Sequence, residues 1–388
     1  MKTVKLKQKE ERRILRGHPW VFSNELDRSP VEFAPGEIVD VLDSMGRFLG
    51  RGYINPHSLI AVRLLTRIQE EINAGFFRRR IAVARSLRSS LGFGDSFRAV
   101  FSEGDNLPGL IVDKYADTLV VQSSTAGIDG MLNEILDALR EEYAPEAIIL
   151  RNDTASRELE GLARETRVVH GAISGPVTFE ESGIKYRVDV LEGQKTGFFF
   201  DQRENRLALK GYVQGRRTLD CFCYVGAWAL SAARFGATEV IGLDSSEKAI
   251  ALATENAALN GLSVQFKKAD VFDELRVLEK QRERFGCIVL DPPAFVKSRA
   301  KVREGLKGYK EINLRAMKLL RPEGILITSS CSHHFSDVAF DAVLADAAND
   351  ASVTAQVLYR TGAAPDHAVL AGFPESHYLK CRIIKITV

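Results

Sequence analysis

The sequence of 388 residues has no uninterrupted apolar run near the roughly 20 residues that a membrane-spanning helix needs. Its first residues, Met-Lys-Thr-Val-Lys-Leu-Lys, alternate charged and apolar side chains, unlike the apolar core of a secretory signal peptide. Only five cysteines are present, an odd number, and their spacing is not that of a disulfide framework. We therefore expect a cytoplasmic protein with neither a membrane partner nor a cystine scaffold.

An excess of charge of one sign is also lacking, since 53 Lys and Arg residues oppose 51 Asp and Glu residues. The 45% hydrophobic and 27% charged residues are typical of a folded globular protein. Basic residues are nevertheless clustered in three stretches, 1–16, 76–90 and 297–310. Such clusters are typical either of solvated surface or of a surface that binds nucleic-acid phosphates, and both interpretations stay open here.

No internal repeat or low-complexity linker divides the chain, so changes of periodicity define the expected domains. Residues 1–70 hold short strand-like runs between turns, which predicts a small β-rich domain. Residues 74–182 alternate helical and strand patterns, typical of a compact α/β middle domain. Residues 183–388 repeat apolar strands and helical stretches, which predicts an α/β, doubly wound, mostly parallel sheet. The final strands, near 353–359 and 378–386, are expected to pair as an antiparallel hairpin at one edge.

Polar residues follow five successive strands of this predicted sheet, each at the point where a strand ends. They are Asp220, Asp244, Asp270, Asp291 and Cys331. In open α/β sheets, ligands bind beyond the carboxyl ends of the strands, where these residues are expected. One aspartate there is commonplace as a helix N-cap, but four on one edge are less easily explained as caps.

The turn after the first strand contains a single glycine, Gly226, and lacks the Gly-x-Gly-x-x-Gly loop that cradles a pyrophosphate. Asp244 follows Asp220 by 24 residues, about where an acid binds ribose hydroxyls. Asp270 is placed to contact the adenine end of the same ligand. An adenosine ligand without phosphates fits this set, so the pattern favours S-adenosylmethionine over NAD.

The fourth strand runs into Asp291-Pro-Pro-Ala-Phe295. Two prolines fix the backbone, so the carboxylate and the aromatic ring are held at the edge of the sheet. A flat base is expected to stack on Phe295 while Asp291 bonds its polar edge. The alternative is a structural turn with an N-capping aspartate. The three acids upstream favour the functional interpretation.

Cys331, at the end of the fifth strand, fits chemistry on cytosine. Carbon 5 of cytosine is a poor nucleophile. A thiolate that adds to carbon 6 makes an enamine, and carbon 5 can then attack the methyl group. Burial as a small apolar side chain is the usual role of cysteine, and it is the interpretation we favour for the other four. A lone Cys-x-Cys and the His333-His334 pair lack further ligands, so no metal site is expected.

Longer stretches occur in a fixed order along the chain. They are GHPWVF at 17–22, EGDNLPGLIVD at 103–113, GQKTGFFFDQREN at 193–205, DPPAF at 291–295, SCS at 330–332 and FPESHYLK at 373–380. In this order they resemble, nearly end to end, the class I S-adenosylmethionine-dependent methyltransferases that make 5-methylcytidine in 23S ribosomal RNA. That family carries an N-terminal PUA domain, a small β domain that binds RNA.

The resemblance implies that Cys331 is the nucleophile and that Asp291 contacts both a flipped cytosine and the cofactor. It implies an S-adenosylmethionine pocket lined by Phe199, Asp201, Gln202, Asp220, Gly226, Asp244 and Asp270. Lys297 and Arg299, just after the catalytic loop, are expected to bind RNA phosphates. Many RNA cytosine-5 methyltransferases carry a second cysteine in that loop, and this chain has none. The base that removes the carbon-5 proton is therefore left open between Asp291 and water.

Three alternatives remain at this level. The Asp-Pro-Pro-aromatic motif is also typical of enzymes that methylate an exocyclic amine of guanine or adenine, which need no cysteine. A non-catalytic RNA-binding assembly factor would not need the four aspartates, and a dehydrogenase would need a phosphate loop. The sequence identifies neither the nucleotide modified nor whether the chain forms a homodimer.

Overall fold

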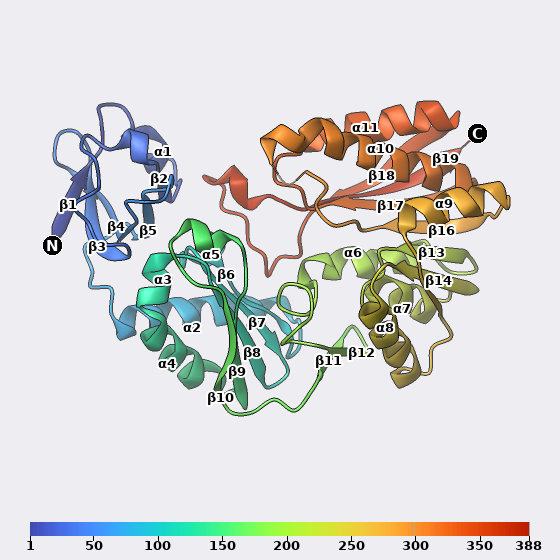
Figure 1. The fold of residues 1–388 in the computed structure, drawn as a ribbon, viewed down its shortest axis with the longest axis horizontal. Helices are drawn as coiled ribbons and strands as arrows, with labels where there is room; N and C mark the ends of the chain where they lie inside the picture. Colours follow the sequence, from blue (N-terminus) through green and yellow to red (C-terminus); the bar gives the residue numbers. More distant parts are fainter. Residues whose placement is uncertain (297, 388) are drawn as a thin grey trace. The chain divides into compact units, whose positions relative to one another are not determined.

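The computed structural model describes residues 1–296 and 298–387, and its internal contacts divide the chain into two compact units (Figure 1). Unit 1 comprises Met1–Phe179, Asp189–Phe198 and Pro365–Ser376, and unit 2 comprises Glu180–Val188, Phe199–Ala364 and His377–Val388. Two stretches that lie beyond Phe179 in the sequence thus pack within unit 1. None of the helices formed by the described residues has the length and apolar character that crossing a bilayer requires.

The N-terminal part of unit 1 is a five-stranded sheet in the order β1-β3-β4-β5-β2. Its strands are β1 (Lys2–Lys5), β2 (Trp20–Val21), β3 (Glu37–Leu42), β4 (Phe48–Ile54) and β5 (Val62–Thr66), with the short helices α1 (Glu11–Leu15) and η1 (Ser23–Glu25). The basic N-terminus forms the edge strand β1, parallel to β3. The other pairs are antiparallel.

A second five-stranded sheet in unit 1 has the order β10-β9-β8-β7-β6. Its strands are β6 (Phe97–Phe101), β7 (Leu110–Tyr115), β8 (Thr118–Ser123), β9 (Ala147–Asn152) and β10 (Glu165–His170), and its helices are α2 (Ala74–Leu91), η2 (Ser102–Asp105), α3 (Ala126–Gly130), α4 (Leu132–Tyr143) and α5 (Ser156–Leu159). Gly127 of α3 packs on the ring of Tyr53, where a Cβ would lie 2.0 Å from the ring. Tyr53 also bonds Thr125 at 2.9 Å, so the two sheets share one packed interface.

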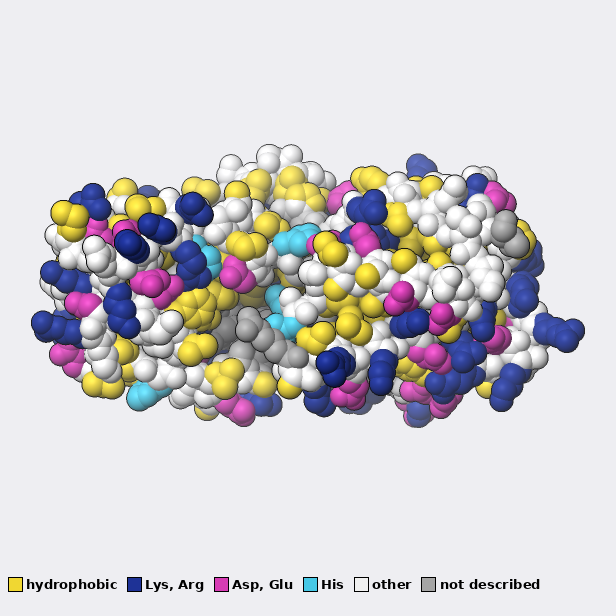
Figure 2. Space-filling view, turned by 90° about the horizontal axis from the view of Figure 1, so that it is seen from above, with side chains coloured by type: hydrophobic (Ala, Val, Ile, Leu, Met, Phe, Trp, Pro, Cys, Tyr) yellow, Lys and Arg dark blue, Asp and Glu magenta, His cyan; other side chains and the backbone are white. Residues whose placement is uncertain are grey.

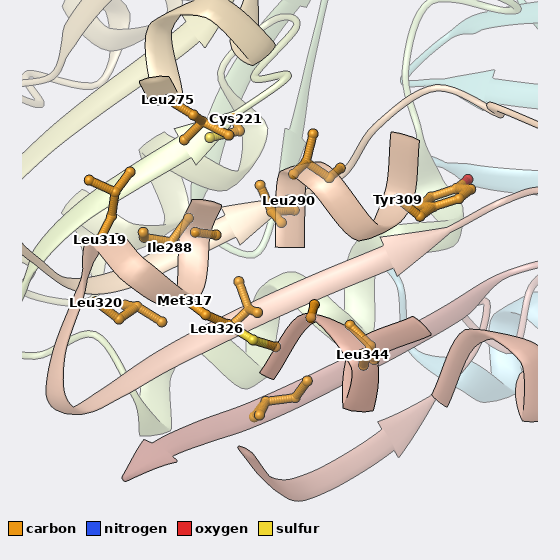
Figure 3. Close-up of a cluster of buried hydrophobic side chains, with 14 of the residues drawn as sticks. Cys221, Leu275, Ile288, Leu290, Tyr309, Met317, Leu319, Leu320, Leu326 and Leu344 are labelled. Carbon is orange, nitrogen blue, oxygen red and sulfur yellow. The ribbon is translucent and has the colours of Figure 1, made fainter. Parts of the chain in front are cut away.

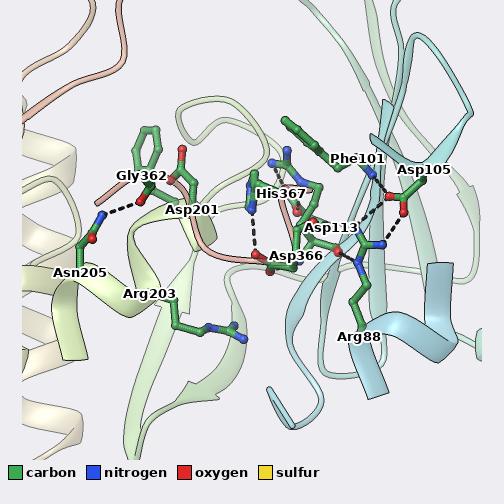
Figure 4. A network of polar contacts seen from close by, with 12 residues as sticks. Arg88, Phe101, Asp105, Asp113, Asp201, Arg203, Asn205, Gly362, Asp366 and His367 are labelled. Atoms are coloured by element: carbon green, nitrogen blue, oxygen red, sulfur yellow. Dashed lines mark hydrogen bonds and ion pairs between the residues drawn. The ribbon is translucent and has the colours of Figure 1, made fainter. Parts of the chain in front are cut away.

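The C-terminal stretch Pro365–Ser376, which includes η6 (Pro374–Ser376), is bonded into unit 1 around one buried arginine (Figure 4). Arg88 of α2 contacts Asp105 at 2.5 and 2.8 Å and the carbonyl oxygen of Asp366 at 2.5 Å. Its side chain is 0% exposed, although it belongs to the basic cluster at 76–90, for which a solvated surface or a phosphate-binding surface was considered. Neither interpretation holds for Arg88, because a guanidinium with a carboxylate partner can be buried as a structural link.

The sheet of unit 2 has seven strands in the order β15-β14-β13-β16-β17-β19-β18. The strands are β13 (Arg217–Cys221), β14 (Glu239–Asp244), β15 (Gln265–Lys268), β16 (Phe285–Leu290), β17 (Leu320–Ser330), β18 (Thr354–Thr361) and β19 (Lys380–Thr387). The first five run parallel, and β19 is antiparallel to both β17 and β18. The predicted doubly wound sheet with an antiparallel terminal pair is confirmed, with β18 outermost. A separate two-stranded sheet joins β11 (Val177–Glu181) to β12 (Ile184–Val188).

Helices cover both faces of this seven-stranded sheet. They are η3 (Phe200–Gln202), α6 (Arg203–Ala208), η4 (Leu209–Gly211), α7 (Ala227–Arg234), α8 (Glu247–Leu259), α9 (Val271–Lys280), η5 (Arg299–Lys301), α10 (Val302–Leu319) and α11 (Asp337–Ala351). Along β16, Ile288 and Leu290 pack with residues of α9, α10 and α11, as Figure 3 shows in part. Cys287 and Val289 pack on the opposite face with residues of α7. The parallel strands are continuous apolar runs because both of their faces are buried.

Candidate active site

The carboxyl edge of the parallel strands brings the predicted polar residues together. Cys221 of β13 is in register with Leu243 of β14 and Leu290 of β16. Asp220, Asp244 and Asp291 each lie within one residue of these positions, so their side chains are at one level of the sheet. Burial raises the pKa of Asp220 well above its usual range, and the charges of Asp291 and Asp244 add to this effect. The three carboxyl groups therefore share one electrostatic environment.

Asp220 is the most deeply buried of these acids, at 0% exposure. Its Oδ2 accepts a hydrogen bond of 2.9 Å from the backbone N–H of Ala229 at the start of α7. Its Oδ1 is buried and has no hydrogen-bond partner among the described residues. A buried carboxylate oxygen without a donor is costly, so a ligand that brings a cationic donor would be favoured here.

The loop that joins β13 to α7 has an unusual backbone. Phe222, Tyr224 and Gly226 have φ values of +67°, +48° and +87°. Gly226 also leaves no room for a side chain, because a Cβ would lie 2.9 Å from the ring of Phe266. Asp244 fixes the loop by accepting the backbone N–H of Tyr224 at 3.0 Å. The single glycine identified in the sequence is thus required for close packing of the loop, although it does not form a phosphate cradle.

Asp291 is held by two side-chain donors. Gln202 donates from Nε2 to Oδ1 at 2.8 Å, and Trp228 donates from Nε1 to Oδ2 at 2.9 Å. Burial raises the pKa of Asp291 to about 6, and the charge of Asp201 contributes to the rise. Near neutral pH this carboxyl group therefore exchanges between its protonated and ionised forms, as a group that gives and takes a proton must.

The part of the 193–205 stretch that lies in unit 2 packs against the edge of the sheet. The ring of Phe199 lies edge-on to Tyr224, with centroids 5.6 Å apart. Asp201 accepts the hydroxyl of Tyr378 at 2.5 Å, and Asn205 donates to Gln202 Oε1 at 2.7 Å (Figure 4 shows Asp201 and Asn205). Phe199, Asp201 and Gln202 are therefore brought to the same edge as the aspartates.

Cys331 follows directly after β17 and is partly exposed, whereas the other four cysteines are buried. Burial raises the pKa of Cys287 to about 12 and of Cys381 to about 11, so these thiols stay protonated. The prediction that the other four cysteines are buried apolar side chains is confirmed. Among the five cysteines, Cys331 is the one whose thiol can meet a substrate.

A hydrogen-bond chain ties the Cys331 loop to the loop that follows Asp291. Ser330 Oγ donates to Tyr309 Oη at 2.9 Å, and Tyr309 Oη lies 3.0 Å from Ser332 Oγ. Ser332 Oγ accepts the backbone N–H of Val296 at 3.2 Å. Tyr309 of α10 thus fixes the residues on both sides of Cys331 and connects them to the 291–296 loop.

Lys380, the first residue of β19, is a neighbour of Cys331 that the sequence did not reveal as functional. It is 2% exposed, and its Nζ donates to the carbonyl oxygens of Ser332 at 3.0 Å and Tyr378 at 2.8 Å. The one available signal was a lysine at the start of the apolar strand KCRIIKI, within the 373–380 stretch. A lysine there is unusual because β19 lies between two other strands of the sheet, β17 and β18, and is largely buried.

The remaining predicted site residues have different surroundings. Asp270 is exposed, and its side chain accepts the N–H of Asp273 at 3.2 Å, so it acts as the N-cap of α9. Phe295 is partly buried in a cluster with Phe222, Phe272 and Tyr309, at centroid distances of 4.8–6.3 Å. Arg299 is the first residue of η5, and Lys297 lies outside the described residues.

The carboxylates at this edge fit S-adenosylmethionine. That molecule carries a sulfonium and an ammonium group against one carboxylate, so its net charge is positive. A sheet edge that carries Asp201, Asp220, Asp244 and Asp291 favours a cation and disfavours the phosphates of NAD. The buried, unpartnered oxygen of Asp220 adds a position for a cationic donor. The fold and this edge together define a class I S-adenosylmethionine-dependent methyltransferase.

Comparison with known proteins agrees. Residues 4–67 match the model of the PUA-like domain family, and residues 167–372 match that of S-adenosylmethionine-dependent methyltransferases. The chain is 41% identical to ribosomal RNA large subunit methyltransferase I of Tolumonas auensis and 42% identical to its namesake in Shewanella amazonensis, each over 99% of both chains. The chain therefore belongs to the ribosomal RNA large subunit methyltransferase I family, and S-adenosylmethionine is its cofactor.

Solved structures share the fold at lower identity. A putative methyltransferase from Streptococcus mutans superimposes with a TM-score of 0.85 at 21% identity, covering 99% of this chain and 100% of that chain. A structure of a putative methyltransferase complexed with SAH gives the same TM-score, identity and coverage. These likenesses show that the whole chain, from the PUA-like domain to β19, adopts an architecture already seen in methyltransferases.

Proposed function

We propose that the protein transfers a methyl group from S-adenosylmethionine to carbon 5 of a cytidine in 23S ribosomal RNA, through a covalent adduct on Cys331. The observation that carries this proposal is the position of Cys331. It is the partly exposed cysteine, it follows β17, and β17 pairs with β16, the strand that ends just before Asp291. Its loop is bonded to the Asp291 loop. The RNA substrate follows from the names of the relatives, which are ribosomal RNA methyltransferases, and we expect the enzyme to act in the cytoplasm.

Cys331 supplies the nucleophile that activates carbon 5 of the cytosine. Its thiolate adds to carbon 6, which makes carbon 5 an enamine carbon. S-adenosylmethionine, when bound, supplies a methyl group activated by its sulfonium. After carbon 5 carries the methyl group, a base removes the carbon-5 proton and the thiolate is expelled. A cysteine is suited to both steps because its thiolate is a good nucleophile and a good leaving group.

Asp291 stabilises the negative charge that develops on the cytosine ring when sulfur adds to carbon 6. As sulfur adds to carbon 6, electron density moves to ring nitrogen 3 of the cytosine. A carboxyl group with a pKa of about 6 can donate its proton there and accept a hydrogen bond from the exocyclic amine. Gln202 and Trp228 hold the carboxyl group in place for this role. The carbon-5 proton then leaves to Asp291 or to water.

In the cofactor pocket, we assign the free oxygen of Asp220 to the ammonium group of S-adenosylmethionine and Asp244 to its ribose. Phe199, Asp201, Gln202 and Gly226 form the adjoining wall, and Asp270 lies toward the adenine end. Replacing Asp220 with asparagine keeps the acceptor for Ala229 but places an amide where the cation would bind. We expect the affinity for S-adenosylmethionine, measured by calorimetry, to fall roughly 10- to 100-fold.

The matched control for this prediction is Asp273→Asn, which removes an exposed charge from α9 and is expected to leave the affinity unchanged. Equal affinities in the Asp220→Asn variant and the wild type would remove Asp220 from the cofactor pocket. A thermal unfolding curve of each variant separates loss of binding from loss of folding.

The basic clusters differ in how far ion pairs neutralise their charges, and this difference indicates which cluster can bind RNA. Figure 2 shows basic and acidic side chains interspersed over one face of the molecule. On α2, the cluster at 76–90 is neutralised by ion pairs of Arg78, Arg79 and Arg85 with glutamates. Around the start of α10, the exposed residues Lys301, Arg303 and Lys307 have no ion pair within the described part of the chain. We assign this second cluster to RNA phosphates.

A triple variant, Lys301→Gln, Arg303→Gln and Lys307→Gln, is therefore expected to bind ribosomal RNA more weakly. The magnitude of the slope of log affinity against log salt concentration should fall by about 2 to 3, because fewer counterions are released when fewer phosphates are contacted. The control is Arg78→Gln, Arg79→Gln and Arg85→Gln on α2, which should change the slope little. Filter binding across a salt series measures both, and equal slopes for the two triple variants would contradict the assignment.

The direct test of the proposed reaction uses labelled S-adenosylmethionine and ribosomal RNA. The product RNA is digested to nucleosides and separated. We expect the label in 5-methylcytidine. Label in a methylated guanosine or adenosine would overturn the cytosine-5 assignment and favour transfer to an exocyclic amine.

A further inference from the structure

The side chain of Lys380 is a buried cation without a carboxylate partner. It is 2% exposed, and no Asp or Glu of the described residues lies within ion-pairing distance of its Nζ. Buried lysines are rare and are normally paired, because an uncompensated charge in a protein interior is costly. The charge of Lys380 therefore calls for an anion that this unit supplies during its function.

The hydrogen bonds of Lys380 place the ammonium group alongside Cys331. Ser330 pairs with Lys380 across β17 and β19, and the carbonyl of Ser332 accepts from Nζ at 3.0 Å. These two residues flank Cys331 in the sequence. The carbonyl of Tyr378 takes a second donor at 2.8 Å. An ammonium has three donors, so one remains for a thiolate.

The other charged groups around Lys380 are already engaged. Asp337 of α11 is paired with Arg382 at 2.7 Å and with His377 at 3.1 Å. Burial lowers the pKa of Lys380, and Asp337 and Cys331 act against this lowering while Arg382 adds to it. Tyr309 of α10, which faces Cys331, has a pKa raised by burial and stays neutral. Cys331, whose neighbour Ser332 accepts a hydrogen bond from Lys380, is therefore a group that the ammonium can stabilise in its ionised form.

We propose that Lys380 is the positioning residue that keeps Cys331 ionised and aimed at the substrate. The inference rests on the proposed function, in which Cys331 is the nucleophile. The ammonium stabilises the thiolate before it attacks carbon 6 and again when it is expelled from carbon 6. It transfers no atom in either step, and its proton stays on Nζ throughout.

The test is the rate of alkylation of Cys331 by iodoacetamide as a function of pH, in the full-length protein. The other four cysteines are buried, and the Cys331→Ala variant gives their background. In Lys380→Gln, which keeps a donor for Ser332 but removes the charge, the pH midpoint should rise by about one unit. The thiolate fraction below the midpoint would then be about tenfold smaller.

Methyl transfer should follow the same change. For Lys380→Gln, we expect kcat/KM to fall about tenfold at neutral pH and to recover as pH rises past the new midpoint. Lys380→Arg, which keeps the charge, should retain the wild-type midpoint. Lys385→Met, which removes a partly exposed charge from the same strand, is the control. A purely structural role for Lys380 would lower activity equally at all pH values.

Each outcome of these experiments either supports or overturns the role proposed for Lys380. An unchanged alkylation midpoint in folded Lys380→Gln overturns it, even if activity is lost. Should Lys380→Gln fail to fold, a wild-type midpoint in Lys380→Arg supports the inference and a raised one overturns it. Failure of the proposed function is distinguishable, because turnover would then persist in Cys331→Ala whatever the midpoint.

Discussion

The Cys331→Ala variant is expected to lose at least about 10,000-fold of its methyl transfer to ribosomal RNA. Without the sulfur, carbon 5 of cytosine has no enamine form and remains a poor nucleophile. The affinity for S-adenosylmethionine should be unchanged, because the carboxylates of the pocket do not involve Cys331. Single-turnover transfer of a labelled methyl group and calorimetry of cofactor binding measure the two quantities on the same protein.

A trapping experiment tests the same prediction without turnover. In RNA containing 5-fluorocytidine, the carbon-5 position carries fluorine in place of the proton that a base must remove. The thiolate then cannot be expelled after methylation, so the wild type should remain covalently bound to the RNA. Cys331→Ala should give no adduct. Retained turnover in this variant would instead indicate methylation of an exocyclic amine.

The Asp291→Asn variant is expected to lose about 100- to 10,000-fold of kcat/KM, the usual contribution of a general acid or base. Asparagine has no proton to donate to nitrogen 3 of the cytosine, and its amide group would face Gln202 or Trp228, which both donate to Asp291. Gln202→Ala serves as the comparison. It removes one of these donors but keeps the carboxyl group, so its loss should be smaller. Comparable losses would mean that Asp291 acts through its position alone.

Stability against pH gives an independent measure of Asp291. Its pKa is raised from 3.8 to about 6, so the folded state holds this proton more tightly than the unfolded state does. The wild type should therefore lose stability as pH rises from about 4 to about 6, by at most about 3 kcal/mol from this group. In Asp291→Asn this loss is absent, so the difference in free energy of unfolding should move in favour of the variant. A constant difference over this range would contradict the raised pKa.

The sequence by itself determined the parallel sheet and its polar edge. Apolar runs such as the one that ends at Leu290 are buried on both faces, and a strand buried in this way shows in the sequence without knowledge of its neighbours. Parallel strands end at a common edge, so residues at or just after their ends come together whatever the details of packing. These residues are Asp220, Asp244, Asp291 and Cys331. The family resemblance rested on the order of the longer sequence motifs along the chain, and it is confirmed at the level of the rRNA large subunit methyltransferase I family.

Only the tertiary structure decided which charged side chains are paired with other residues of the chain. The arginines of α2 look in sequence like the three basic residues around the start of α10, Lys301, Arg303 and Lys307. The arginines of α2 are paired or buried, whereas those three have no ion pair within the described part of the chain. Asp270 is also the N-cap of α9, and Phe295 also packs among other aromatic rings. Lys380 reaches the carbonyl of Ser332 over 48 positions of sequence. Periodicity records whether a side chain is buried, but the partner of a charge depends on contacts between distant segments, and these exist only once the chain has folded.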